Sequence, residues 1–114
     1  MYPSGQWEGF WFQEAYGQQR MNAFTLRFHK GEIAGEGRDV VGRFTFTGSY
    51  DARNGEVVMI KQYLGKHRVF YRGQPDGEGC IAGVWSIGES WTGPFMMKPA
   101  LGRPRGDEPI EEMD

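Results

Sequence analysis

The chain has 114 residues, of which 39% are hydrophobic and 15% aromatic, and it contains 18 glycines. This length suffices for one domain with a buried core, and the glycine content suits many tight turns around bulky inward rings. The formal net charge of −2 gives no global field that would attract nucleic acid or an anionic membrane, so we expect neither as a partner.

Cys80 is the single cysteine, so the chain can form no internal disulfide. The start of the chain, MYPSGQWEGF, has neither the basic nor the apolar region of a signal peptide. No stretch approaches the roughly 18 apolar residues that a membrane helix needs. We therefore expect a cytoplasmic protein in which Cys80 is a small apolar side chain, buried or half-buried.

Between Gln6 and Lys98 the sequence consists of eight short runs of alternating apolar and polar residues, each closed by a Gly, Asn or Asp turn. This pattern predicts an all-β fold, an up-and-down meander of eight antiparallel strands, and eight strands can close into a small barrel. We assign residues 1–98 to the barrel domain. Residues 99–114 carry Gly, Pro and charges of both signs, which predicts a flexible C-terminal tail.

Charged residues mark the outward face of each run in the first half of the chain, because side chains alternate faces along a strand. In the run 6–12, Glu8 faces out, so Trp7 and Trp11 face in, and Trp7 is expected to plug one end. The runs 20–30 and 40–50 each have one aromatic face. The inward residues of those two runs are Phe24, Leu26, Phe28, Phe44, Phe46 and Tyr50.

The run 32–37 places Ile33, Gly35 and Gly37 inward, where the glycines leave room for rings from across the barrel. The run 56–64 is ambiguous because both of its faces are apolar. Lys61 assigns its own face to solvent, which puts Gln62 inside. Val57, Met59 and Tyr63 would then form, with Phe70, an outer apolar stripe that could hold a homodimer together.

The last three runs are clearer. In the run 66–72 the positive charges alternate with His67, Val69 and Tyr71, so these three side chains face in. The run 81–85 places Ile81, Gly83 and Trp85 on one face, and Lys98 in the run 91–98 assigns Phe95 and Met97 to the interior.

In an up-and-down meander the loops alternate between the two ends, so the connections after the first, third, fifth and seventh strands lie together. These connections are residues 13–19, 38–39, 64–66 and 88–90. The first is the longest of them and is the natural lid. Inward rings, amides and an imidazole near this end are typical of a small-molecule pocket.

The predicted ligand-binding residues are Trp11, Asn22, Tyr50, Gln62, His67, Tyr71, Trp85 and Trp91. The expected ligand is a small, largely apolar molecule of unknown identity, with no cofactor. The alternative is that the ring-rich interior is filled by its own side chains and holds no ligand, since an eight-stranded barrel is barely wide enough for them. The protein would then be a structural or oligomeric interaction module.

The order of the runs and the turn residues between them resemble those of the avidin and streptavidin group of calycin-like barrels. The resemblance covers residues 5–97 and rests on five short motifs. These are Gly5-x-Trp7, Gly31-x-Ile33-x-Gly35, Phe46-Thr47-Gly48-Ser49-Tyr50, Tyr71-Arg72-Gly73-Gln74 and Ile81-x-Gly83-x-Trp85.

The resemblance implies the same barrel and a binding site within it. Trp85 matches an inward tryptophan of the family's biotin site, whereas Ile60 stands in place of the fifth-strand tryptophan. His67 and Val69 occupy the inward sixth-strand places, and the family's last-strand aspartate has no counterpart before the tail. We therefore expect a ligand other than biotin, or none.

Signatures of an enzyme are weak, so we expect a non-catalytic protein. The two histidines, His29 and His67, fall on opposite faces of different strands, which argues against a metal site. Ser86 or Ser90 with His67 and Asp39 would offer triad chemistry, but no nucleophile elbow or oxyanion loop accompanies them.

Proton transfer by His67 and Tyr71 would need a carboxylate, Asp39 or Glu14, to reach the imidazole. The alternative is a buried neutral His67 satisfied by Gln62 or by a backbone carbonyl.

Overall fold

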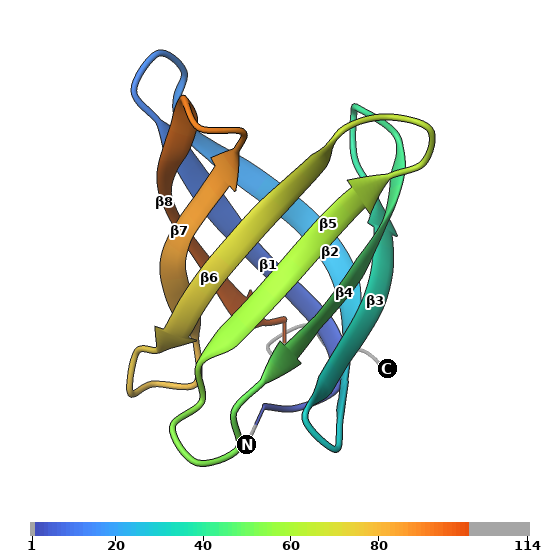
Figure 1. The fold of residues 1–114 in the computed structure, drawn as a ribbon, viewed down its shortest axis with the longest axis vertical. Coiled ribbons are helices and arrows are strands. Elements are labelled where there is room, and N and C mark those ends of the chain that lie inside the picture. The colour runs from blue at the N-terminus through green and yellow to red at the C-terminus, as the bar shows by residue number, and fades with distance from the viewer. Residues whose placement is uncertain (1, 101–114) are drawn as a thin grey trace, which may run out of the picture.

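The fold is a closed antiparallel β-barrel of eight strands in meander order (Figure 1). It is seen in a computed structural model that describes residues 2–100. The strands are β1 (Gly5–Gln13), β2 (Gly17–His29), β3 (Glu32–Arg38), β4 (Arg43–Tyr50), β5 (Val57–Tyr63), β6 (Arg68–Pro75), β7 (Ile81–Ile87) and β8 (Trp91–Pro99). Each strand pairs with its neighbours in sequence, and β1 closes the barrel against β8. The predicted fold class is confirmed.

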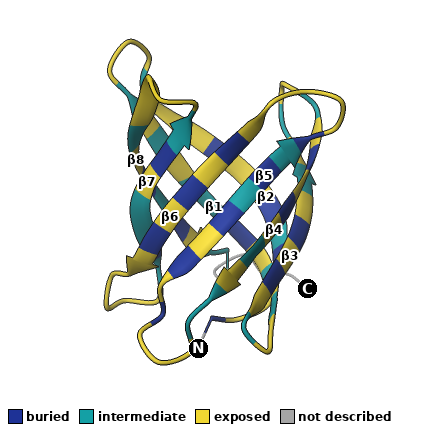
Figure 2. Cartoon of the chain, in the orientation of Figure 1, coloured by how far each residue is buried: buried dark blue, intermediate teal, exposed yellow. Residues whose placement is uncertain are grey.

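Side chains alternate between a buried inner face and an exposed outer face along most strands (Figure 2). The predicted inward faces of β4 and β8 are confirmed, since Phe44, Phe46, Phe95 and Met97 are buried. In the sixth run Val69 and Tyr71 are buried as predicted, but the inward prediction for His67 is wrong, because this residue precedes β6 and is exposed. In β7, Ile81 and Trp85 are buried as predicted, while Val84 between them is exposed. The core is therefore a single cluster of rings and aliphatic side chains inside the barrel.

One end of the barrel is closed by aromatic packing. Trp7 is fully buried there and packs against Tyr2 and Phe28, with ring centroids 6.1 and 5.5 Å away. Its indole Nε1 donates a hydrogen bond to the Pro3 carbonyl at 2.9 Å. Phe28 in turn meets Tyr50 edge to face. The predicted role of Trp7 as a plug is confirmed, and the segment before β1 reinforces it.

A β-bulge in β2 reverses the alternation of that strand. Trp7 pairs with Phe24 but Gly9 pairs with Met21, so two residues of β2, Asn22 and Ala23, oppose one residue of β1. Phe24 and Met21 both face the core, while Asn22 is exposed. The prediction that Asn22 faces the barrel interior is wrong, because an inserted residue shifts every position on one side of it to the other face.

The assignment of faces in β5 is also wrong. Val57, Met59, Lys61 and Tyr63 are all buried, and the alternate residues, Gln62 among them, face outward. Lys61 is the one charged residue among the described residues that is buried. The charge of Lys61 led to the wrong assignment of its face to solvent, because the ammonium has a carboxylate partner inside the barrel. Consequently the expected outer stripe does not exist as predicted, since only Phe70 of its members is exposed.

Two inward glycines of β3 are required for different reasons. A Cβ on Gly37 would lie 2.6 Å from the Phe44 ring and 2.8 Å from Phe24, so this glycine makes room for rings, as predicted. A Cβ on Gly35 would lie 2.1 Å from the Thr25 carbonyl oxygen. Here the glycine instead allows close approach of the β2 backbone.

The barrel extends slightly beyond the predicted domain boundary. Pro99 belongs to β8, and the Ala100 amide donates to the Gln6 carbonyl at 2.9 Å. The remainder of the predicted tail, residues 101–114, lies outside the described residues. Within residues 2–100, no helix has the length and apolar character needed to cross a membrane. The cytoplasmic location stays a prediction.

Candidate ligand-binding site

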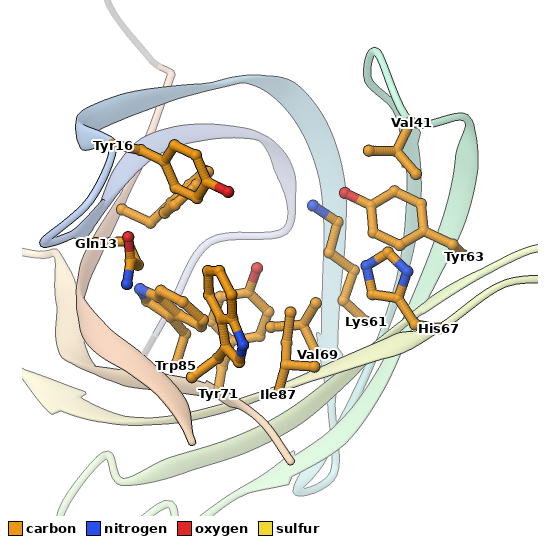
Figure 3. A pocket seen from close by; sticks show the side chains of 12 residues that line it. Gln13, Tyr16, Val41, Lys61, Tyr63, His67, Val69, Tyr71, Trp85 and Ile87 are labelled. Atoms are coloured by element: carbon orange, nitrogen blue, oxygen red, sulfur yellow. The ribbon is translucent and has the colours of Figure 1, made fainter. Parts of the chain in front are cut away.

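A cavity of about 210 Å³ lies inside the barrel, at the end away from the aromatic plug around Trp7. We call this end the mouth. Figure 3 shows the side chains that line the cavity. Twelve residues line the cavity: Trp11, Gln13, Tyr16, Val41, Lys61, Tyr63, His67, Val69, Tyr71, Trp85, Ile87 and Trp91. Most of them are aromatic or aliphatic, and the polar atoms are few, which is the usual composition of a small-molecule site.

The mouth is formed by the connections that follow β1, β3, β5 and β7, as predicted. The first three connections contribute Tyr16, Val41 and His67 to the cavity lining, and Trp91, the first residue of β8, follows the fourth. The first connection is shorter than expected, because β1 runs to Gln13 and β2 begins at Gly17. The extended β1–β2 hairpin projects beyond the other loops at this end (Figure 1). In place of a long lid, Tyr16 at its tip stacks on Trp91 across the rim.

Lys61 and Asp39 form an ion pair beside the cavity. Lys61 Nζ donates to Asp39 Oδ2 at 3.1 Å, and the lysine side chain is 9% exposed. Tyr63 donates its hydroxyl proton to the same carboxylate oxygen at 2.5 Å. The other carboxylate oxygen accepts the Val41 amide at 2.9 Å, which fixes Asp39 within the β3–β4 turn. The carboxylate is therefore satisfied on both oxygens.

The Lys61 ammonium also lies over two aromatic rings. Its Nζ is 4.3 Å from the centroid of Phe44 and 4.8 Å from that of Tyr63, distances at which a cation is attracted to a ring face. Phe44 and Tyr63 are directly paired across β4 and β5, so both rings come from one level of the barrel. The lysine is thus held by a carboxylate and by two ring faces.

Burial and the Asp39 carboxylate together set the protonation equilibria of this group. Burial lowers the pKa of Lys61, and the charge of Asp39 offsets only part of that effect. Burial alone would raise the pKa of Asp39, but the hydrogen bond from Tyr63 and the charge of Lys61 outweigh it, so the pKa is lowered overall. Burial and the neighbouring carboxylate raise the pKa of Tyr63, which keeps its proton.

Tyr71 places a hydroxyl in the cavity without a partner. The residue is 4% exposed and lines the cavity (Figure 3). Within residues 2–100, the buried tyrosines Tyr2 and Tyr63 both donate hydrogen bonds, whereas the Tyr71 hydroxyl makes none. Burial raises the pKa of Tyr71, with a smaller contribution from Asp39, so the group remains a hydrogen-bond donor. A buried unsatisfied hydroxyl is costly unless something else satisfies it.

Two tryptophans form the wall opposite Lys61. Trp85 is buried on β7, and its Nε1 donates to the Phe12 carbonyl of β1 at 3.0 Å. The intervening strand carries Gly93, where a Cβ would meet that same carbonyl oxygen at 2.0 Å and Trp85 Nε1 at 3.0 Å. Trp11 packs edge to face on Trp85 with centroids 5.5 Å apart. Gly93 therefore leaves room for the Trp85 indole to hydrogen-bond to β1 across β8, which fixes its position in the cavity wall.

His67 lies at the rim of the cavity, not within the barrel. It precedes β6, is exposed, and packs its imidazole against the Tyr63 ring at 5.0 Å. Asp39 contacts Lys61 and Tyr63, not the imidazole. Gln62 hydrogen-bonds the carbonyls of Tyr63 and Lys66 at 2.8 Å, and that of His67 at 3.4 Å, from outside. Asp39, one of the two carboxylates considered for proton transfer with His67, is therefore committed to Lys61 and Tyr63.

Five of the eight predicted site residues come together at the cavity: Trp11, His67, Tyr71, Trp85 and Trp91. The other three lie elsewhere. Tyr50 packs with Phe28 at the closed end. Gln62 faces outward for the reason given above, and Asn22 borders a separate space of about 30 Å³ that shares Trp11 and Lys61 with the cavity.

Sequence reasoning missed Lys61 and Tyr63, the two residues that give the cavity its polar side. One signal was available, because Lys61 shares its face with the larger apolar residues of β5, Met59 and Tyr63. Asp39 was correctly placed at the mouth, but nothing in the strand pattern links it to a lysine 22 positions later. Within residues 2–100, no group of three or more His, Cys, Asp and Glu side chains could hold a metal ion.

Comparison with known proteins gave no relative. No protein-family model matches the sequence, no curated protein is similar to it, and no solved structure matches the fold.

Proposed function

We propose that the protein binds a small, largely apolar molecule in the cavity at the mouth of the barrel, without catalysis. The observation that carries the proposal is the contrast between the two ends. Rings fill the end at Trp7, whereas the other end keeps about 210 Å³ of space beside a buried, unpartnered Tyr71 hydroxyl. Side chains normally fill a barrel of this size, so unfilled space next to an unsatisfied donor favours an occupant.

The dimensions and charges of the cavity indicate the class of ligand. An apolar cavity of about 150 Å³ can hold a benzene ring, so the volume here suits one ring with a short polar substituent. The Lys61 charge is balanced by Asp39, which favours a neutral molecule over an ion. The ligand would pack its ring on Trp11 and Trp85 and accept a hydrogen bond from Tyr71.

Benzyl alcohol is a probe of this description, and its binding can be read from thermal unfolding. At 100 times its dissociation constant it should stabilise the folded protein by about 2.7 kcal/mol. Val69→Trp fills the cavity and should abolish the ligand-dependent increase in Tm. Val84→Trp, on the exposed face of β7, should retain it. An equal increase in both variants, or none in the wild type, would refute the proposal.

The kinship to avidin-like barrels is part of this proposal and rests on the sequence motifs together with the eight-stranded closed barrel. The inward residues of β5 near the mouth are Lys61 and Tyr63, whereas Ile60 faces outward. The family has a tryptophan on this strand, so the Lys61 ammonium beside the cavity supports a ligand chemically different from biotin.

A second candidate, an oligomeric interaction module, is favoured by one observation. Ile60 and Phe70 are paired on the outer face of β5 and β6, with Val58 and Val84 on either side of Arg72. Val58, Phe70 and Val84 are exposed. This outer patch replaces the predicted stripe as the surface for a homodimer. Dimer formation that Phe70→Arg abolishes in size-exclusion chromatography would support it, and a monomeric wild type would exclude it.

A further inference from the structure

We propose that Lys61 captures small aromatic aldehydes as a reversible imine, with the carbonyl oxygen held by the Tyr71 hydroxyl. The inference rests on the proposed function, because it names the ligand class of the same cavity. It adds a covalent step that simple binding does not require.

Lys61 is placed as a nucleophilic lysine would be, buried in a largely apolar site with its amine beside the cavity. The side chain lines the cavity, is 9% exposed, and lies against the rings of Phe44 and Tyr63. Lysines buried in apolar sites lose a proton more readily and form Schiff bases with carbonyl compounds. The lowered pKa of Lys61, which burial causes, agrees with this placement.

Tyr71 lies where it can orient the carbonyl group. Lys61 is paired with Val69 across β5 and β6, so Tyr71 is its diagonal inward neighbour, one position deeper in the barrel. Long and aromatic side chains at diagonal positions are within reach of one another. The Tyr71 hydroxyl is buried and has no partner within residues 2–100. A carbonyl oxygen satisfies this donor and presents its carbon toward the amine.

The reaction is balanced without an oxidant or a reductant. Lys61 releases one proton to Asp39 or to water, and its nitrogen attacks the carbonyl carbon to form a C–N bond. The carbonyl electron pair moves to oxygen, which takes up the proton released before the attack and a second proton from the nitrogen, and it leaves as water while the C=N bond forms. In total, a lysine ammonium and an aldehyde give a protonated imine and one water molecule.

The Asp39 carboxylate can balance the charge of Lys61 both before and after the imine forms. Its Oδ2 atom accepts a hydrogen bond from Lys61 Nζ at 3.1 Å and another from the Tyr63 hydroxyl. The protonated imine carries the same single positive charge as the ammonium, so the carboxylate continues to balance it. Capture therefore leaves no uncompensated charge in the cavity.

Reductive trapping tests the step. The full chain is incubated at neutral pH with benzaldehyde and cyanoborohydride, which reduces an imine to a benzylamine, and the modified lysines are mapped by mass spectrometry. Lys61 should be benzylated at least tenfold faster than the exposed Lys30 and Lys98. Excess benzyl alcohol should suppress modification of Lys61 alone. Modification of Lys61 no faster than that of the exposed lysines would overturn the inference.

A matched pair of variants tests the orienting donor. Tyr71→Phe removes only the unpartnered hydroxyl and should slow trapping at Lys61 by about tenfold. Tyr50→Phe, at the closed end of the barrel against Phe28, should leave the rate unchanged. Equal rates in the two variants would overturn the role of Tyr71.

The two proposals fail in different ways. If benzyl alcohol raises the Tm but benzaldehyde is not trapped at Lys61, the imine is refuted and non-covalent binding stands. If neither compound acts on the wild type, the binding site itself is refuted.

Discussion

At the scale of single residues, the ion pair inside the mouth is asymmetric. Lys61 is almost fully buried, whereas the Asp39 side chain is 24% exposed and also accepts hydrogen bonds from Val41 and Tyr63. Removing one partner of a buried pair is costly mainly because the other charge is left without compensation. The two partners should therefore contribute very differently to stability.

Asp39→Asn should destabilise the protein by about 3 kcal/mol, because it leaves the buried Lys61 ammonium without a counter-charge. Lys61→Met, which replaces the charge with an apolar side chain of similar length, should change the stability by less than about 1 kcal/mol. Urea denaturation measures both. A Lys61→Met variant that is destabilised as much as Asp39→Asn would contradict this assignment.

The two cavity tyrosines form a second contrast. Tyr63→Phe removes a hydrogen bond to a carboxylate and should cost about 1.5 to 3 kcal/mol. Tyr71→Phe removes a buried hydroxyl that makes no hydrogen bond, so it should be neutral or stabilising without ligand. Denaturation of both variants in the absence of ligand checks the difference. A loss of stability in Tyr71→Phe equal to that in Tyr63→Phe would show that its hydroxyl is already satisfied.

At the scale of strands, the sequence predicted faces well wherever charge and burial agree. β4 and β6 alternate as expected because their charged residues all face solvent. The prediction failed in β5, where the partner of Lys61 comes from the β3–β4 turn, and in β2, where the bulge at Asn22 and Ala23 shifts the alternation. Both failures arise from contacts with neighbouring elements, which the pattern of one strand does not contain.

Residues of the candidate site were predicted correctly on the strands whose inward face was assigned correctly. Trp85 and Tyr71 were found because β6 and β7 alternate regularly, and the meander order placed their mouth-side ends together. Tyr63 was assigned to the outer surface because it shares the face of Lys61. One misassigned strand therefore removed most of the polar side of the cavity from the prediction.

Gly48 of β4 tests the close packing of the strands. A Cβ at this position would lie 2.1 Å from the Val58 carbonyl oxygen and 2.8 Å from the Met59 Cα. These are backbone atoms, so Gly48→Ala should cost about 1 to 3 kcal/mol. Thr47→Ala, on the exposed face of the same strand, should cost less than about 1 kcal/mol. Equal costs in urea denaturation would contradict the close approach.

At the scale of the whole molecule, the barrel has a closed end and an open end. Tyr2, Trp7, Phe28 and Tyr50 close one end, and the segment before β1 is tied down where the Tyr2 hydroxyl donates to the Gly55 carbonyl at 2.5 Å. The cavity lies at the other end and shares no residue with this aromatic cluster. Stability and binding should therefore be separable.

Tyr2→Ala should lower the free energy of unfolding by about 3 kcal/mol, because it removes a buried ring and its hydrogen bond. The dissociation constant for benzyl alcohol, measured below the Tm of the variant, should be unchanged. A large loss of affinity would mean that the two ends are coupled.

The most direct test of the proposed binding site is a crystal soaked in 4-bromobenzyl alcohol, with the bromine located by its anomalous scattering. We expect a bromine peak inside the mouth, with the ring against Trp11 and Trp85 and the alcohol oxygen at hydrogen-bond distance from the Tyr71 hydroxyl. An empty cavity at saturating ligand, or bromine found only on the outer surface of the barrel, would contradict it.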